Sequence, residues 1–129
     1  MRVFITTLVA AALSGLVLSA QTPGDATKGK TTYTERKCGT CHRTTDADQT
    51  GGKLATVLGD TAGKLSDADI RKWLTEPAAM EKSLPKKPPM PMSAYLKSLN
   101  PPLSQTEISN LVAYVRTLAP KAGPEPASR

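Results

Sequence analysis

Apolar residues recur every three or four positions in three stretches of the chain, which is the spacing of one face of an α-helix. Ser66 with Asp69, and Ser104 with Glu107, have the form of capping boxes and predict the starts of the second and third helices. The second helix should end near Pro77. The chain shows no strand-like alternation, so the sequence predicts an all-α fold of three or more short helices. The apolar faces are Ala26, Gly29 and Tyr33 within residues 24–37; Ile70, Trp73 and Leu74; and Ile108, Leu111, Val112, Val115 and Leu118.

The connections between these helices are long. A stretch rich in Gly, Thr and Asp follows His42 and runs to about Lys64, and it is expected to be a loop. Residues 78–82 are typical of a short helix. Six prolines interrupt residues 83–102, which predicts an ordered but irregular loop with little regular structure.

The two ends of the chain carry patterns of a different kind. A positive start is followed by an apolar run over residues 3–18 and by small residues at 19–20, the layout of a secretory signal. We expect residues 1–20 to be removed and the mature protein to be exported to the periplasm; an uncleaved membrane anchor is the alternative. Residues 21–119 then form one domain, and the Pro- and Ala-rich residues 120–129 form a disordered tail.

Composition limits how this domain can be built. Of the 129 residues, 39% are hydrophobic but only 4% are aromatic. A small domain buries a low fraction of its surface, so we expect a large cofactor to supply apolar bulk. With 17 Lys and Arg against 11 Asp and Glu the net charge is +6, and the composition argues against a collagen-like, coiled-coil or polytopic membrane chain.

Cys38-Gly39-Thr40-Cys41-His42 is a Cys-x-x-Cys-His motif, the attachment signature of c-type haem. Two thiols three positions apart can each form a thioether with one haem vinyl group, and the next residue brings an imidazole to the iron. A thioredoxin-like pair needs a βαβ context, zinc needs further ligands, and a disulfide across two residues stabilises little. The sequence therefore predicts one haem c, attached through Cys38 and Cys41, with His42 as proximal iron ligand.

The second axial ligand has to be another type of residue, because His42 is the only histidine. Methionine is the usual partner and raises the potential of a c-type haem. Met80 lies in the predicted helical stretch 78–82 and is better explained as a packing residue. Met90 and Met92 lie in the proline-stiffened loop, which can hold a thioether at the iron, although both can also be packing residues.

At these positions the chain resembles a monohaem class I cytochrome c over most of residues 24–118. That family has a Gly and, four residues later, an aromatic before its Cys-x-x-Cys-His motif, as Gly29 and Tyr33 stand here. Its last helix carries a Leu and an aromatic three apart, as do Leu111 and Tyr114. The resemblance implies a cytochrome c-like fold around the haem, with close helix contact at Gly29 and Tyr33 packed on Tyr114.

The resemblance also bears on the haem ligands. Its Met-Pro loop is similar to Met90-Pro91, which favours Met90 over Met92 and makes His42 and Met90 the metal ligands. Trp73 lies in a segment similar to one in which a Trp often lies beside a haem propionate; core packing is an equal alternative. The family's Gly-Pro after the haem motif is missing, so another backbone carbonyl must accept the imidazole N–H of His42.

Charge and apolarity near the haem suggest which side chains tune it. A ring of basic residues at the haem edge would steer the protein to acidic redox partners, and scattered solubilising charges are the alternative. Lys64 and Lys72 are candidate partners of the propionates. The pocket candidates are Leu54, Val57, Leu58, Leu74, Leu111 and Val115, and the basic residues are Lys28, Lys30, Arg36, Lys37, Arg43, Lys82, Lys86, Lys87 and Lys97.

An iron with two protein ligands has no open position, so the expected chemistry is outer-sphere electron transfer rather than enzymatic turnover. The leading hypothesis is a periplasmic c-type cytochrome that carries single electrons between redox proteins, membrane-bound ones included, with no nucleic acid or small-molecule substrate. The first alternative is a cytochrome subunit held permanently on a periplasmic dehydrogenase or respiratory complex. The second is a haem enzyme or sensor with five-coordinate iron.

Overall fold

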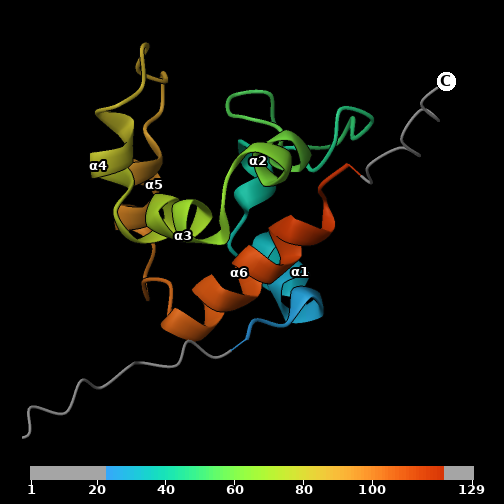
Figure 1. Ribbon diagram of the computed structural model, residues 1–129. Coiled ribbons are helices and arrows are strands. Elements are labelled where there is room, and N and C mark those ends of the chain that lie inside the picture. Colours follow the sequence, from blue (N-terminus) through green and yellow to red (C-terminus); the bar gives the residue numbers. More distant parts are fainter. Residues whose placement is uncertain (1–22, 121–129) are drawn as a thin grey trace, which may run out of the picture.

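The computed structural model describes residues 23–120, which fold into short helices (Figure 1). Between residues 23 and 120 there is no strand, and this confirms the predicted all-α fold. The elements in chain order are α1 (Ala26–Glu35), the 3₁₀ turn η1 (Cys38–Thr40), α2 (Leu58–Lys64), α3 (Asp67–Thr75), α4 (Pro77–Glu81), α5 (Met92–Ser98) and α6 (Gln105–Thr117).

Helix α6 crosses α1 at close range, as Figure 1 shows. A Cβ atom on Gly29 would lie 2.0 Å from the carbonyl oxygen of Asn110, so only glycine allows this approach. The rings of Tyr33 and Tyr114 pack beside it with centroids 5.6 Å apart. The backbone N–H of Asp25 donates to Oδ1 of Asn110 at 2.8 Å and fixes the start of α1. The predicted crossing, including its glycine and its tyrosine pair, is confirmed.

Both predicted capping boxes are present. Ser66 accepts from the backbone N–H of Asp69 and opens α3, and Ser104 does the same with Glu107 at the start of α6. The predicted short helix before the proline-rich loop is α4, which begins at Pro77. Local sequence signals therefore placed the starts of α3 and α6 correctly.

Two helices lie where the sequence predicted loops. Helix α2 occupies the end of the Gly- and Thr-rich stretch, because Gly59 and Ala62 are buried and the helix packs against α6. Helix α5 lies inside the proline-rich stretch, because the prolines flank residues 92–98 and none falls within them. Pro91 immediately precedes its first turn, a place where proline is tolerated. In both cases tertiary packing and proline position outweigh local composition.

The protein buries few apolar side chains outright. Four of them, Ala62, Ile70, Val112 and Val115, form one cluster between α2, α3 and α6. Arg116 closes this cluster by donating to the carbonyl oxygens of Ala62 and Leu65 and to the carboxylate of Asp67. The other buried apolar residues, Ile108, Leu111 and Tyr114, also lie on α6. The core is therefore narrow and centred on one helix.

The predicted signal segment, residues 1–20, and the tail beyond residue 120 lie outside the described residues and stay predictions. Over residues 23–120, no helix combines the length and the apolarity needed to cross a membrane.

Candidate functional site

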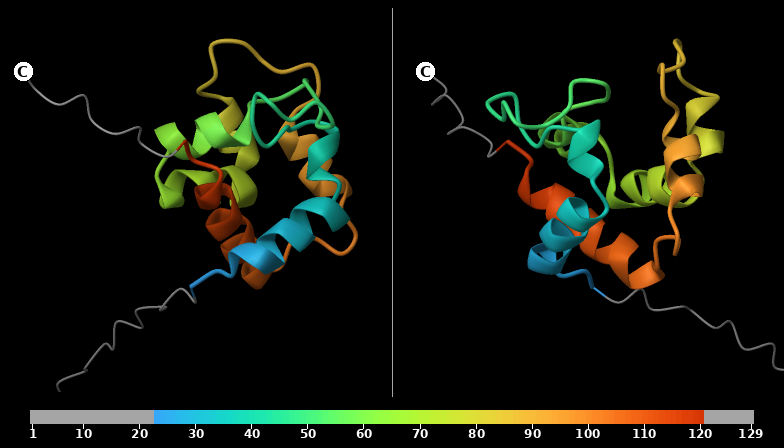
Figure 2. Two further views of the ribbon diagram at one scale, coloured as in Figure 1. Left: turned by 90° about the vertical axis from the view of Figure 1, so that its right-hand side faces the viewer. Right: turned by 180° about the vertical axis from the view of Figure 1, so that it is seen from behind.

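The helices surround one large cavity of about 550 Å³, and each helix of residues 23–120 contributes to its mostly apolar wall. Figure 2 (left) shows the helices arranged in a ring around this space. A cavity of this size is in the range of sites that hold small molecules and cofactors. Beside the buried cluster between α2, α3 and α6, many apolar residues of this chain thus face one common space.

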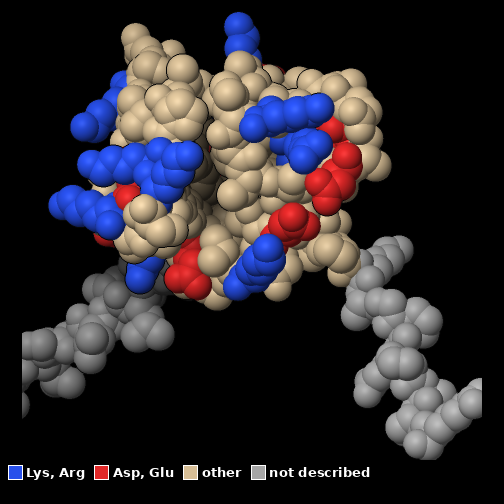
Figure 3. Space-filling view, turned by 90° about the horizontal axis from the view of Figure 1, so that it is seen from above, with Lys and Arg blue, Asp and Glu red and all other residues tan. Residues whose placement is uncertain are grey.

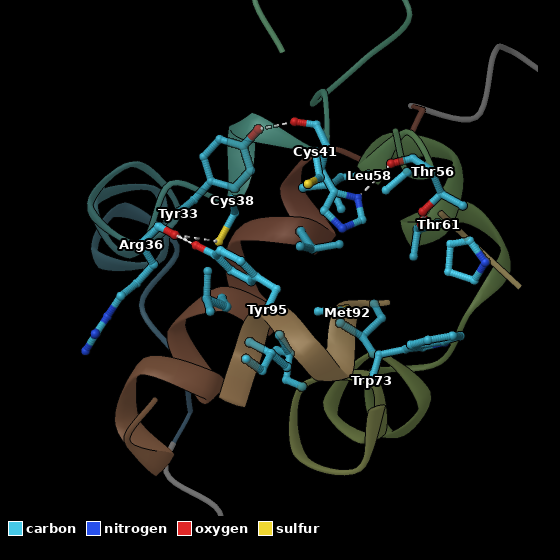
Figure 4. Close-up of a pocket in the computed structure, with 18 of the residues that line it drawn as sticks. Tyr33, Arg36, Cys38, Cys41, Thr56, Leu58, Thr61, Trp73, Met92 and Tyr95 are labelled. Carbon is cyan, nitrogen blue, oxygen red and sulfur yellow. Dashed lines mark hydrogen bonds between the residues drawn. The ribbon is translucent and has the colours of Figure 1, made fainter. Parts of the chain in front are cut away.

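The Cys-x-x-Cys-His motif lies at the wall of this cavity. The backbone N–H of Cys41 and that of His42 both donate to the carbonyl oxygen of Cys38, at 3.2 and 3.0 Å. Lys37, just before the turn, has the left-handed backbone angle φ of 53°. Cys38, Cys41 and His42 all line the cavity, and Figure 4 shows the sulfur atoms of the two cysteines at its wall. The motif thus has the compact turn that two thioether bonds to one cofactor require.

The two thiols are not joined to each other. Burial raises the pKa of the Cys38 thiol to about 11, so in this environment the thiol keeps its proton at neutral pH. A zinc site is also not formed, because no group of three or more His, Cys, Asp or Glu residues converges anywhere in residues 23–120. The motif therefore presents two separate thiols beside an imidazole, a donor set that fits covalent attachment of a haem.

A backbone carbonyl holds the ring of His42 in place. Nδ1 of His42 lies 2.9 Å from the carbonyl oxygen of Thr56. Because a carbonyl oxygen only accepts, Nδ1 is the donor in this hydrogen bond, and Nε2 is the ring nitrogen left to bind a metal. Thr56 thus supplies the carbonyl that the sequence required but could not identify. The hydroxyl of Thr61 donates to the carbonyl of Val57 at 3.1 Å and so braces the same segment.

Tyr33 supports the same residue from the other side. Its hydroxyl donates to the carbonyl oxygen of His42 at 2.7 Å. Burial raises the pKa of Tyr33 to about 12, so the phenol stays protonated and remains a donor throughout the neutral range. The side chain that packs α1 against α6 therefore also fixes the backbone of the histidine.

The two candidate methionines differ in their placement. Met90, the residue favoured from the sequence, lines the rim of the cavity but is 55% exposed. Met92 is half-buried at the first position of α5 and also lines the cavity. Figure 4 shows Met92 across the cavity from Cys41 and Thr56. Met80 is not part of the lining and agrees with its interpretation as a packing residue.

A carboxylate joins α4 to the start of α5. Oε1 of Glu81 accepts the backbone N–H of Ser93 at 2.8 Å, and Oε2 accepts the Ser93 hydroxyl at 2.7 Å. These hydrogen bonds from Ser93 hold the pKa of Glu81 below its ordinary value. Nothing in the sequence pattern indicated this pair, which is separated by twelve positions and lies next to Met92.

Most of the predicted pocket residues line the cavity, and one does not. Trp73 is half-buried on its wall, as Figure 4 shows. Leu54 was predicted wrongly: it is 55% exposed and lies outside the lining, because it precedes the segment that turns toward His42. Tyr95 was missed; it lies one turn after Met92, a spacing that could have indicated it. The confirmed predictions are Val57, Leu58, Leu74, Leu111 and Val115.

The basic residues of the predicted ring differ in their surroundings. Figure 3 shows Lys and Arg side chains on both sides of a hollow in one face of the protein, with acidic side chains between them. Arg36, predicted to belong to the basic ring, instead binds Glu107 at 2.7 Å and the carbonyl oxygen of Pro101 at 2.9 Å. Lys64 lines the cavity, whereas Lys72 does not. Arg36 is therefore a structural link between α1 and the start of α6.

A family model described as "Cytochrome c" matches residues 26–119, which is more than half of the chain and lies within the predicted domain 21–119. The search of curated proteins and the search of solved structures found no match.

Proposed function

The chain belongs to the cytochrome c family, and on this premise we propose that it is a periplasmic electron carrier whose haem iron is held by His42 and Met92. The family carries haem c, attached here through Cys38 and Cys41, and its function is electron transfer. When bound, haem c supplies a one-electron couple at its iron. The observation that carries the proposal is the cavity onto which both thiols, the imidazole and a half-buried thioether converge.

The chain's own residues prepare His42 for this role before any electron moves. The hydrogen bond to Thr56 occupies Nδ1 and leaves Nε2 as the nitrogen that would bind the iron, and such a bond also raises the basicity of the ligand. Tyr33 holds the backbone of the same residue. A ligand held from two sides moves little, and small movement keeps the reorganisation on electron transfer small.

Met92 is a better candidate than Met90 for the second axial ligand, although the Met-Pro pair favours Met90. The apolar thioether of Met92 can be buried beside the cavity without a desolvation penalty, and the position of Met92 in α5 restricts its backbone. Met90 precedes the helix and is mostly exposed. Trp73 is proposed to donate its indole N–H to a propionate, which is supported by its half-buried place in the cavity wall.

The optical spectrum of the oxidised holoprotein tests this ligation, through the weak long-wavelength sulfur-to-iron band. We expect the band in the wild type and in Met90→Ala and its loss in Met92→Ala. Loss in Met90→Ala alone would keep the function and return the ligand to the residue favoured from the sequence. A wild type without the band that binds carbon monoxide readily when reduced would mean an open iron, and a haem enzyme or sensor would then be the better explanation.

Acidic redox proteins are the proposed partners. Lys82, Lys86 and Lys87 are all exposed on the loop between α4 and α5, whose residues Pro88 and Met90 reach the cavity. Charge of one sign beside the redox centre speeds encounter with the opposite charge, and this effect weakens with salt. We expect the double substitution of Lys86 and Lys87 by Gln to slow reduction by an anionic iron complex and to flatten its salt dependence. A neutral iron complex is the control, and equal slowing with both reagents would refute steering.

The alternative of a permanently bound subunit has one observation in its favour. Leu84 and Met90 expose apolar surface on the same loop as these lysines. Purification of the native protein decides between the two: a monomer supports the free carrier, and co-purification with a dehydrogenase or respiratory complex supports the subunit.

A further inference from the structure

Helix α5 begins without a cap of its own. Its N-cap residue is Pro91, which has no side-chain acceptor, and the first residue of the helix is Met92. The N–H groups of a first helical turn have no partner within the helix, and a nearby oxygen normally satisfies them. The carbonyl oxygen of Pro91 accepts the N–H groups of Ala94 and Tyr95, so the N–H of Ser93 is the one that needs an acceptor from elsewhere in the chain.

Glu81, at the end of α4, supplies that group. Its two carboxylate oxygens bind the backbone N–H and the hydroxyl of Ser93, at 2.8 and 2.7 Å, so that both act on one residue. Hydrogen bonds to an ionised acceptor are roughly twice as strong as neutral ones. This contact closes residues 82–92 into a loop whose base is the Glu81–Ser93 pair, directly beside Met92.

The same helix is held at a second point one turn later. The hydroxyl of Tyr95 donates to the carbonyl oxygen of Arg36, which lies two residues before Cys38. Glu81 and Tyr95 both line the cavity. One contact thus ties α5 to the attachment motif, and the other ties the end that carries Met92 to α4. Without the contact between Glu81 and Ser93, no side chain from another helix would hold the first turn of α5 through these hydrogen bonds.

We propose that Glu81 is a positioning residue, which holds the first turn of α5 so that the thioether of Met92 stays at the iron. This inference rests on the proposed His42/Met92 ligation. Substitution of Glu81 leaves the Met92 side chain unchanged, but the helical turn that carries it loses its hydrogen bonds to α4. The sulfur then leaves the iron more often, and a ligand from solution competes more effectively for the vacated position.

The test is the affinity of the oxidised holoprotein for imidazole, together with the intensity of the sulfur-to-iron band. Binding of imidazole requires dissociation of the methionine, so its apparent affinity measures that dissociation. Loss of a charged hydrogen-bonded partner corresponds to about a tenfold increase in Glu81→Ala. Ser93→Ala loses one of the two bonds and should give a smaller increase. Glu35→Ala removes an equally negative, exposed residue and should match the wild type.

The outcomes separate the two proposals. If the wild type binds imidazole as tightly as Met92→Ala does, the ligation itself is wrong. If Met92→Ala binds far more tightly but Glu81→Ala behaves as the wild type, the ligation stands and the positioning role is refuted. An equal increase in Glu81→Ala and Glu35→Ala would assign the effect to charge alone and also overturn it. Should Glu81→Ala fail to mature, Ser93→Ala decides, and an unchanged affinity there counts against the proposal.

Discussion

Substitution of Gly29 by alanine tests the helix crossing on which the attachment site depends. The added Cβ would lie 2.0 Å from the carbonyl oxygen of Asn110 and 2.7 Å from Cβ of Tyr114. Neither atom can rotate away, since one belongs to the backbone and the other is fixed to it. Cβ contacts under 3.0 Å are essentially never seen, so α1 and α6 would have to separate by about 1 Å.

Two opposing effects determine the size of the loss. Alanine favours a helix over glycine by about 1 kcal/mol. Overpacking a well-packed contact typically costs about 1–3 kcal/mol, and a clash with backbone belongs at or above the upper end. We therefore expect Gly29→Ala to lose about 2 kcal/mol of unfolding free energy, which for a domain of this size lowers Tm by roughly 10 °C.

Thermal unfolding of the haem-loaded protein measures this loss, and Gly63→Ala is the matched control. Gly63 is also helical, but its added Cβ would meet only Cδ of Pro120 at 3.7 Å, an ordinary contact. This control should therefore gain up to about 1 kcal/mol and melt a few degrees higher. A Gly29→Ala protein that melts with the wild type, or above it, would refute the close-contact argument.

Three further predictions concern the attachment turn and its supports. Gly52→Ala places a Cβ 2.0 Å from the carbonyl oxygen of Thr40, a clash at the attachment turn. We therefore expect a lower yield of haem-loaded protein, measured as haem absorbance per protein. A normal yield would contradict this prediction. Tyr33→Phe removes a half-buried donor and should lower the stability by about 1 kcal/mol, seen as a lower denaturant midpoint at constant slope. An unchanged midpoint would count against the bond. The backbone N–H of Ser104 holds the pKa of Glu107 below its ordinary 4.5, so its stabilisation is present above that pH and is lost as the pH falls further. Glu107→Gln should flatten that loss in acid unfolding curves, and an identical pH dependence would exclude the carboxylate.

Features that depend on neighbours in the sequence were predictable. The capping boxes at Ser66 and Ser104 satisfy N–H groups three residues away, so a short pattern determines them. The Cys-x-x-Cys-His motif is equally local, since one turn presents all of its donors. The family resemblance added the crossing at Gly29, because the glycine and the aromatic after it keep a fixed spacing.

Features that depend on distant residues were not predictable in the same way. Thr56 orients His42 across fourteen positions, and any backbone carbonyl could have done so. Glu81 caps α5 across a loop whose prolines suggested irregular structure. Helix α2 has a poor helical sequence, and burial of Gly59 and Ala62 stabilises it. In each case the deciding partner belongs to another element, so no window of sequence contains the information.

Because the core is narrow and the cavity is large, the stability of this protein depends on contacts between the cavity wall and its cofactor. A reversibly bound cofactor stabilises the folded state by an amount that grows with the logarithm of its free concentration and disappears when that concentration falls. Thioether bonds at Cys38 and Cys41 make the contacts of the cavity wall part of one covalent molecule. The folding equilibrium then does not depend on the concentration of free cofactor. The stability of the protein is set once, when the second bond closes, and it remains the same in any volume into which the protein diffuses.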